Sequence, residues 1–180
     1  MIKFILGFVA AAALFVVVAL VFAGDLMLKE HPSPFGVEET AARIQRNIQG
    51  LSNNGWSLSG LRNPARAVAA SGTNVPPVLL IEACSTKYSG PILKDGDVRI
   101  LSILMPCTIT VYKKDDGKTY IGLMNSGLMG RMFGAKVGSI MGEVAKDQAK
   151  FIDFDPSKPA PPLIKVQAGG GKGGPAAGGC

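Results

Sequence analysis

The residues best suited to chemistry in this sequence are two cysteines near its middle. Cys84 follows the apolar run 78–81, which has the composition of a buried strand, and Cys107 precedes the alternating β-branched segment 108–112. If these segments are antiparallel neighbours in one sheet, both thiols lie at the same end of it, within reach of a disulfide or a shared ligand. Three interpretations stay open: a structural disulfide or two packed thiols, a redox-active or sulfur-handling pair, and a soft-metal site.

The soft-metal interpretation draws on methionines that follow one another around Cys107 in the sequence. Met105 and Met124 are the first candidates, and Met129 and Met132 lie further along the chain. Thiolate and thioether sulfurs suit Cu(I), so copper is the metal we expect at such a site. The chain has one histidine and no paired C-x-x-C, which argues against zinc and against a Ser-His or Cys-His relay. The sequence therefore favours a binding protein over an enzyme.

Four glycines recur at every fourth position of a helix that we predict over residues 127–151: Gly130, Gly134, Gly138 and Gly142. Each glycine costs about 1 kcal/mol relative to alanine in a helix interior, so another element must pack closely against this stripe. The contact is either a helix–helix seam with a second copy or a membrane partner, or the packing of this helix within its own domain. The sequence leaves both open.

The third cysteine, Cys180, ends a glycine-rich arm. The ending Gly178-Gly179-Cys180 resembles the swinging-arm terminus of the periplasmic sulfur-carrier protein of thiosulfate oxidation, although the two glycines that follow the cysteine in that family are absent here. The resemblance implies a mobile thiol that accepts sulfur covalently. The alternative is a thiol without a role, or one that forms an intermolecular disulfide.

An uncharged N-terminal run indicates the cellular compartment in which these thiols lie. Residues 4–23 carry no charge and no proline, and at about 1.5 Å of rise per residue they span roughly 30 Å, the thickness of a bilayer core. The run is longer than the apolar region of a typical signal peptide, so we interpret residues 1–24 as a retained anchor rather than a cleaved signal. We expect a single-pass inner-membrane protein with its domain on the periplasmic side.

The rest of the chain has room for one domain, at 25–154, and a tail. Helical spacing covers 37–51, Asn63-Pro64 starts a short helix, and strands are expected near 27–31, at 56–61, at 78–81 and in a hairpin at 108–123. Between the strands at 78–81 and 108–112, residues 86–104 are predicted to form an irregular segment with turns. The Pro- and Gly-rich stretch 155–180 is predicted to be disordered. This order indicates an α+β fold, one antiparallel sheet with helices on one face.

Several short motifs lie along the predicted domain: residues 33–40 at the start of the first helix, Gly55-Trp56, Pro76-Pro77, Met105-Pro106-Cys107 and 116–118. In these motifs, and over about 29–151, the chain resembles the bacterial family called domain of unknown function 302. The resemblance implies a TATA-binding-protein-like arrangement of strand, helix, sheet and helix. It also implies dimers and, in some members, a place among sulfur-oxidation proteins, but no activity.

Net charge adds little to the functional assignment. The formal charge is +6, but the basic residues are scattered, and no basic run is interleaved with aromatic residues. Nucleic acid is therefore not an expected partner. We expect a membrane-anchored periplasmic binding or assembly module that forms a homodimer or docks on a membrane protein complex. The alternatives are a thiol-based sulfur-handling protein using Cys84, Cys107 and Cys180, and a Cu(I)-binding protein.

Overall fold

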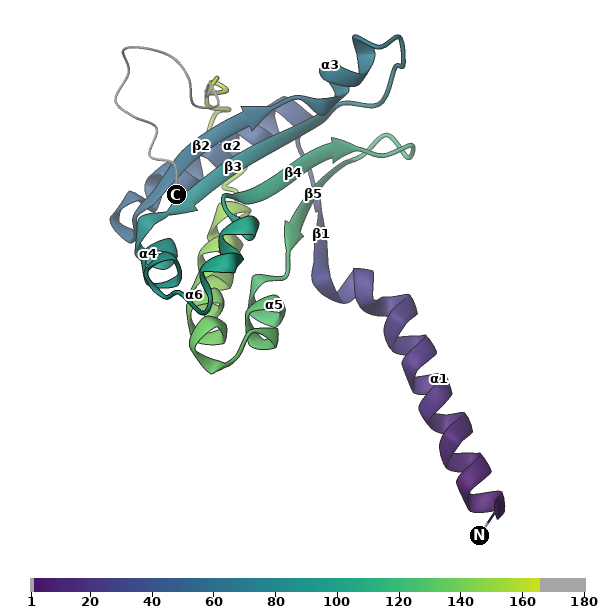
Figure 1. The fold of residues 1–180 in the computed structure, drawn as a ribbon. Helices are drawn as coiled ribbons and strands as arrows, with labels where there is room; N and C mark the ends of the chain where they lie inside the picture. Colours follow the sequence, from purple (N-terminus) through teal and green to yellow (C-terminus); the bar gives the residue numbers. More distant parts are fainter. Residues whose placement is uncertain (1, 166–180) are drawn as a thin grey trace.

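The alternating strands of this chain form one five-stranded antiparallel sheet, and the amphipathic helices pack on one of its faces (Figure 1). The computed structural model describes residues 2–165, and it describes the side chains of all of these except 2–6, 10 and 18–23. The strands are β1 Leu28–Ser33, β2 Trp56–Arg62, β3 Val78–Ser85, β4 Cys107–Lys113 and β5 Thr119–Met124. The α-helices are α1 Ile2–Met27, α2 Val37–Gly50, α3 Pro64–Ala69, α4 Thr86–Lys94, α5 Ser126–Met132 and α6 Ala135–Phe151, with 3-10 turns η1 Ser52–Asn54 and η2 Arg99–Leu104.

The strand order across the sheet is β1-β5-β4-β3-β2. The predicted hairpin is confirmed: β4 and β5 are antiparallel, with Tyr112 opposite Tyr120, and Gly117 supplies the left-handed backbone (φ +78°) that the turn needs. β3 pairs with β4 on one side and with β2 on the other, so the predicted apolar strand is central to the sheet. The α+β prediction with one antiparallel sheet is therefore confirmed.

The core lies between the sheet and the layer made by α2 and α6 (Figure 1). The helical spacing of α2 is confirmed, because Ala41, Ile44 and Ile48 have no exposed surface. Val144 and Phe151 of α6 join the same cluster. At the far end of β2, Asn63 caps the short helix α3 as predicted, its side chain accepting a hydrogen bond from the Arg66 amide at 2.8 Å.

Helix α1 runs away from the domain from the edge strand β1 (Figure 1). Its described apolar side chains are uncovered: Phe8 is 73% and Phe15 75% exposed. Over the residues that the structure describes, none of the helices combines the length and apolar character needed to cross a membrane.

The segment 86–104 departs from the turns predicted for it. α4 runs through Ser89-Gly90-Pro91, and η2 follows it. Burial outweighs the local turn signals here, because Tyr88 and Ile92 of α4 and Leu101 of η2 are sequestered against the end of the sheet.

The single last helix predicted over 127–151 is also wrong. It is broken into α5 and α6 at Phe133-Gly134, where Gly134 has φ +91°. That left-handed conformation ends one helix and lets the next turn back on it, which an L-residue with a side chain adopts only at a cost.

The tail prediction fails for its first part. Residues 155–165 cross the outer side of α2 in an irregular path, and Leu163 packs against the core. The side chain of Gln45 binds the backbone of Ile164 twice, donating to its carbonyl at 2.9 Å and accepting from its amide at 2.8 Å. Residues 166–180, with the predicted disorder there, lie outside the described residues.

Candidate functional site

An apolar pocket lies at the end of the sheet where β3 ends and β4 begins. It is enclosed by α4, η2, α5 and α6, and its cavity measures about 40 Å³. Nearly all of its lining is hydrocarbon or sulfur, including Leu101 and Leu104 from η2 and Met129 and Val137 from the α5–α6 pair. A cavity of this size and character admits a small apolar group rather than a polar substrate.

The structure places both central cysteines at this end of the sheet, as predicted, but on opposite faces. Cys107 is opposite Ala83 in the β3–β4 register, so its neighbour Cys84 points the other way. Cys107 is a free thiol, whereas Cys84 is disulfide-bonded. The disulfide between Cys84 and Cys107 that the sequence allowed is therefore not formed. Both residues line the pocket, but only Cys107 does so as a thiol.

The environment of Cys107 suppresses its reactivity. Burial raises the pKa of the Cys107 thiol to about 11, because the surrounding hydrocarbon disfavours the thiolate. The thiolate is the nucleophile in thiol chemistry, so at neutral pH this cysteine behaves as a small apolar side chain.

Three methionines meet Cys107 around the pocket: Met105, Met129 and Met141. Of the methionines predicted as metal ligands, Met105 and Met129 are brought to the thiol, while Met124 lies on the open face of the sheet in a groove with Tyr112 and Leu28, and Met132 is 60% exposed. No cluster of three or more His, Cys, Asp or Glu occurs among residues 2–165. Any metal held at the pocket would therefore have thioether and thiolate ligands, the set that suits Cu(I).

The glycine stripe is used inside the domain. A Cβ on Gly130 would overlap the Cβ of Met141, so this glycine lets α5 and α6 pack closely, whereas a Cβ on Gly138 would make an ordinary contact of 3.4 Å with the Cα of Arg131. Gly134 forms the turn between the helices, and Gly142 has nothing within 4 Å of its missing side chain. Of the two interpretations left open by the sequence, packing within the domain accounts for Gly130 and Gly134.

Sequence reasoning missed a buried carboxylate beside the pocket. Asp147 of α6 is 2% exposed and accepts hydrogen bonds from Trp56 Nε1 at 2.9 Å, the Tyr88 hydroxyl at 2.9 Å and Asn54 Nδ2 at 3.1 Å. Lys150 Nζ lies 2.8 Å from its other oxygen. An acid within the apolar stripe of α6, between Val144 and Phe151, was the available signal.

These partners decide the charge of Asp147. Burial raises the pKa of its carboxyl group, but the hydrogen bonds from Lys150, Trp56 and Tyr88 outweigh burial, so the net pKa lies below its usual value. Burial, with the hydrogen bond to Asp147, raises the pKa of Tyr88 to about 12. The pair is therefore an ionised acceptor and a protonated donor at neutral pH, an arrangement that fixes one wall of the pocket.

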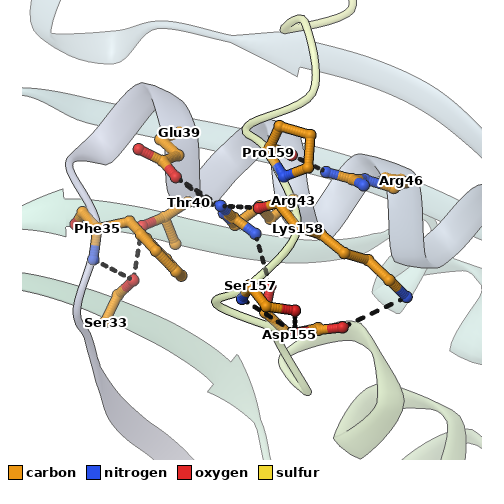
Figure 2. A network of polar contacts seen from close by, with 10 residues as sticks. All are labelled: Ser33, Phe35, Glu39, Thr40, Arg43, Arg46, Asp155, Ser157, Lys158 and Pro159. Carbon is orange, nitrogen blue, oxygen red and sulfur yellow. Dashed lines mark hydrogen bonds and ion pairs between the residues drawn. The ribbon is translucent and has the colours of Figure 1, made fainter.

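A second polar network holds residues 155–165 on α2 (Figure 2). Arg43 is 6% exposed and pairs with Glu39 at 2.8 Å, and its remaining donors reach the carbonyls of Asp155 at 3.1 Å and Lys158 at 2.8 Å. Its guanidinium also lies 4.0 Å from the centre of the Phe35 ring. Because these contacts tie residues 155–165 to α2, we interpret the network as structural.

The last predicted site residue, Cys180, lies outside the described residues, so its predicted role as a mobile thiol stays a prediction.

Comparison with known proteins gives a family and a fold. A family model described as "Domain of unknown function DUF302" matches residues 29–154. The chain is also similar to the solved structure of an uncharacterized conserved protein DUF302 from Bacillus stearothermophilus, with 18% identity and a TM-score of 0.61 over 71% of this chain and 96% of that chain. No curated protein matches it.

Proposed function

Because this chain belongs to the family of domain of unknown function DUF302, whose name states no activity, we propose from its own residues that it is a membrane-attached binding module. In this proposal α1 holds the domain at the periplasmic side of the inner membrane, and the domain binds a partner or an apolar group. The sulfur-handling alternative receives less support, since burial keeps the Cys107 thiol protonated.

One observation supports the proposed attachment of the domain to the membrane through α1. The apolar side chains of α1 that the structure describes are uncovered, and none of them belongs to either apolar cluster of the domain. An uncovered apolar helix needs another apolar surface. The uncharged run 4–23 is of the length that a bilayer accommodates, and about half of it lies outside the described side chains.

Cell fractionation tests the attachment. The full chain, with alkaline phosphatase fused after residue 180, is expected in the membrane fraction with phosphatase activity, because that enzyme folds only where disulfides form. The matched control lacks residues 4–23 and should lose both properties. A full-length fusion that stays in the soluble fraction, or that is membrane-bound but inactive, would contradict the attachment or its orientation, respectively.

The binding role is supported by the character of the pocket. Its lining offers sulfur and hydrocarbon with few polar atoms, which suits an apolar side chain or acyl group of a partner. One such partner is a second copy of this chain, and analytical ultracentrifugation in detergent tests that case directly.

A second candidate function, Cu(I) binding, rests on the four sulfur side chains Met105, Cys107, Met129 and Met141 that line one cavity. Copper binding would displace the thiol proton and so overcome the raised pKa of Cys107. Anaerobic titration against a chromophoric Cu(I) chelator should show competition by the wild type and none by Cys107→Ser. Met124→Leu is the matched control, since Met124 lies outside the pocket, and equal competition by all three proteins would remove this candidate.

A further inference from the structure

Apart from α1 and its junction with β1, the most exposed large apolar side chains of the described domain gather on η2 and α5. Ile100 is 76% and Ile103 82% exposed, and Met132 and Phe133 are 60% and 42% exposed. Exposed apolar residues are normal when they are scattered singly, but a group of four on neighbouring elements marks an interaction surface.

The two elements meet around the apolar pocket. Leu101 and Leu104 of η2 line the same cavity as Met129 and Phe133 at α5, so both elements border one pocket, and of the four exposed side chains Phe133 is part of its lining. At α5 the whole turn 131–136 is exposed. We call the apolar surface on Ile100, Ile103, Met132 and Phe133 the η2–α5 surface, and Phe133 connects it to the apolar lining of the pocket.

The position of the η2–α5 surface relative to α1 indicates which partner binds it. Asn125, which caps α5, donates from its backbone amide to Met27 O at 2.7 Å and from its side chain to Leu26 O at 2.8 Å. α5 therefore starts at the last turn of α1, and its seven residues extend only about 10 Å further. In Figure 1, α5 and the turn into α6 lie on the side of the domain toward which α1 runs, whereas α3 lies at the opposite end.

The charges around the surface are mainly basic. Arg131 and Lys136 bracket the exposed turn, Arg99 precedes Ile100, and Lys94 ends α4. The acids in the same region are Asp95, which pairs with Lys136, and Asp97. A basic rim around apolar side chains is complementary to the headgroup region of an anionic bilayer, where each Lys or Arg near the surface contributes about 1 kcal/mol.

We propose that the η2–α5 surface inserts into the headgroup–acyl boundary of the membrane to which α1 attaches the domain, so that the domain lies against the bilayer with its apolar pocket facing lipid. This proposal rests on the proposed attachment through α1. It adds a second, independent contact with lipid, and it makes the acyl chain of a phospholipid the apolar group nearest to the pocket.

Depth-dependent quenching tests the contact in the full chain. Phe133→Trp places a fluorophore on the η2–α5 surface, and Val75→Trp places one on an exposed apolar position of the α3–β3 loop. Both proteins are reconstituted into vesicles of phosphatidylglycerol mixed with phosphatidylcholine brominated on its acyl chains. The wild type, whose one tryptophan is the buried Trp56, supplies the background to be subtracted. We expect tryptophan at 133 to lose most of its added emission, and tryptophan at 75 to lose none.

Vesicle flotation separates the two proposals. Protein that floats with the vesicles but shows no quenching at 133 overturns the lipid contact and leaves the attachment intact. Protein that does not float overturns the attachment and, with it, this contact. A blue-shifted but unquenched tryptophan at 133, together with a doubled mass in detergent, would assign the surface to a second copy of the chain and also overturn the proposal.

Discussion

Asp147 connects parts of the chain that are distant in sequence. Its carboxylate is shared by Trp56 at the start of β2, Tyr88 in α4 and Lys150 one turn further along α6. The rings of Trp56 and Phe151 pack edge to face with centroids 4.9 Å apart on the same side. A single ionised group therefore sets the relative position of the sheet end, α4 and α6, the elements that enclose the pocket.

Replacing that carboxylate should destabilise the domain. In Asp147→Asn the amide keeps one acceptor oxygen but turns a donor group toward donors, so we expect a loss of roughly 2 kcal/mol in the free energy of unfolding. Because the folded pKa of Asp147 is lowered, its contribution is fully present above about pH 4 and is lost as the pH falls through the folded pKa. Urea unfolding at pH 7 and at pH 3 measures both. The exposed Asp153→Asn is the control, and equal stability of the two variants at pH 7 would contradict this role.

A separate prediction concerns the rate at which the Cys107 thiol is alkylated. With a pKa of about 11, its thiolate fraction at pH 7 is on the order of one in ten thousand, and it should rise about tenfold per pH unit. Alkylation by iodoacetamide, followed by mass spectrometry of the peptide containing Cys107, should therefore be slow at pH 7 and accelerate steadily up to pH 10. A rate that levels off below pH 9 would show an activated thiol, and would favour sulfur chemistry instead.

At the scale of elements, the sequence predicted those whose periodicity agrees with their burial. The spacing of Ala41, Ile44 and Ile48 located α2, and the β-branched hairpin located β4 and β5. α4 was missed because Ser89-Gly90-Pro91 has local turn preferences, whereas the burial of Tyr88 and Ile92 is a tertiary effect.

The candidate site was less accessible to sequence reasoning than the fold. The sequence placed both cysteines at one end of the sheet, but the face that each occupies depends on the register of β3 with β4, which no short pattern determines. The contact of Gln45 with Ile164 joins segments more than a hundred positions apart, and it orders residues whose composition is typical of a disordered tail. Composition indicates how a segment behaves in isolation, whereas residues 155–165 are held by contacts with α2.

The α5–α6 pair allows two glycines of one stripe to be compared. In Gly130→Ala the new methyl group would collide with Met141 Cβ, which is held by the helix backbone and cannot rotate away, so we expect a loss of about 1–3 kcal/mol. Gly142→Ala meets open space within a helix and should gain up to about 1 kcal/mol. Thermal unfolding of the two variants in parallel gives the comparison. A strong destabilisation by Gly142→Ala would show that this glycine packs against another molecule.

At the scale of the whole molecule, the chain divides into a helix, α1, whose described apolar side chains are exposed, and a domain with its own buried core. The buried clusters draw on α2, the sheet, α4, η2 and α6, and the match to the DUF302 family begins at residue 29, just after α1. The domain holds α1 through Asn125, whose two hydrogen bonds end on Leu26 and Met27. Under the proposed attachment, this division separates the part that contacts the membrane from the part that folds.

Removing the greater part of α1 should therefore change where the protein goes without changing how the domain folds. A chain starting at Asp25 keeps both acceptors of Asn125, so its unfolding midpoint in detergent should match that of the full chain to within about 2–4 °C, the shift that corresponds to roughly 1 kcal/mol for a chain of this length. Circular dichroism melts of the two proteins measure this. A shortened chain that starts at Lys29 loses Leu26 and Met27 as well and should melt lower, because the cap of α5 then has unpaired donors. If the chain starting at Asp25 were already unfolded, α1 would be part of the folding unit, and its exposed apolar side chains would need a partner within the protein rather than lipid.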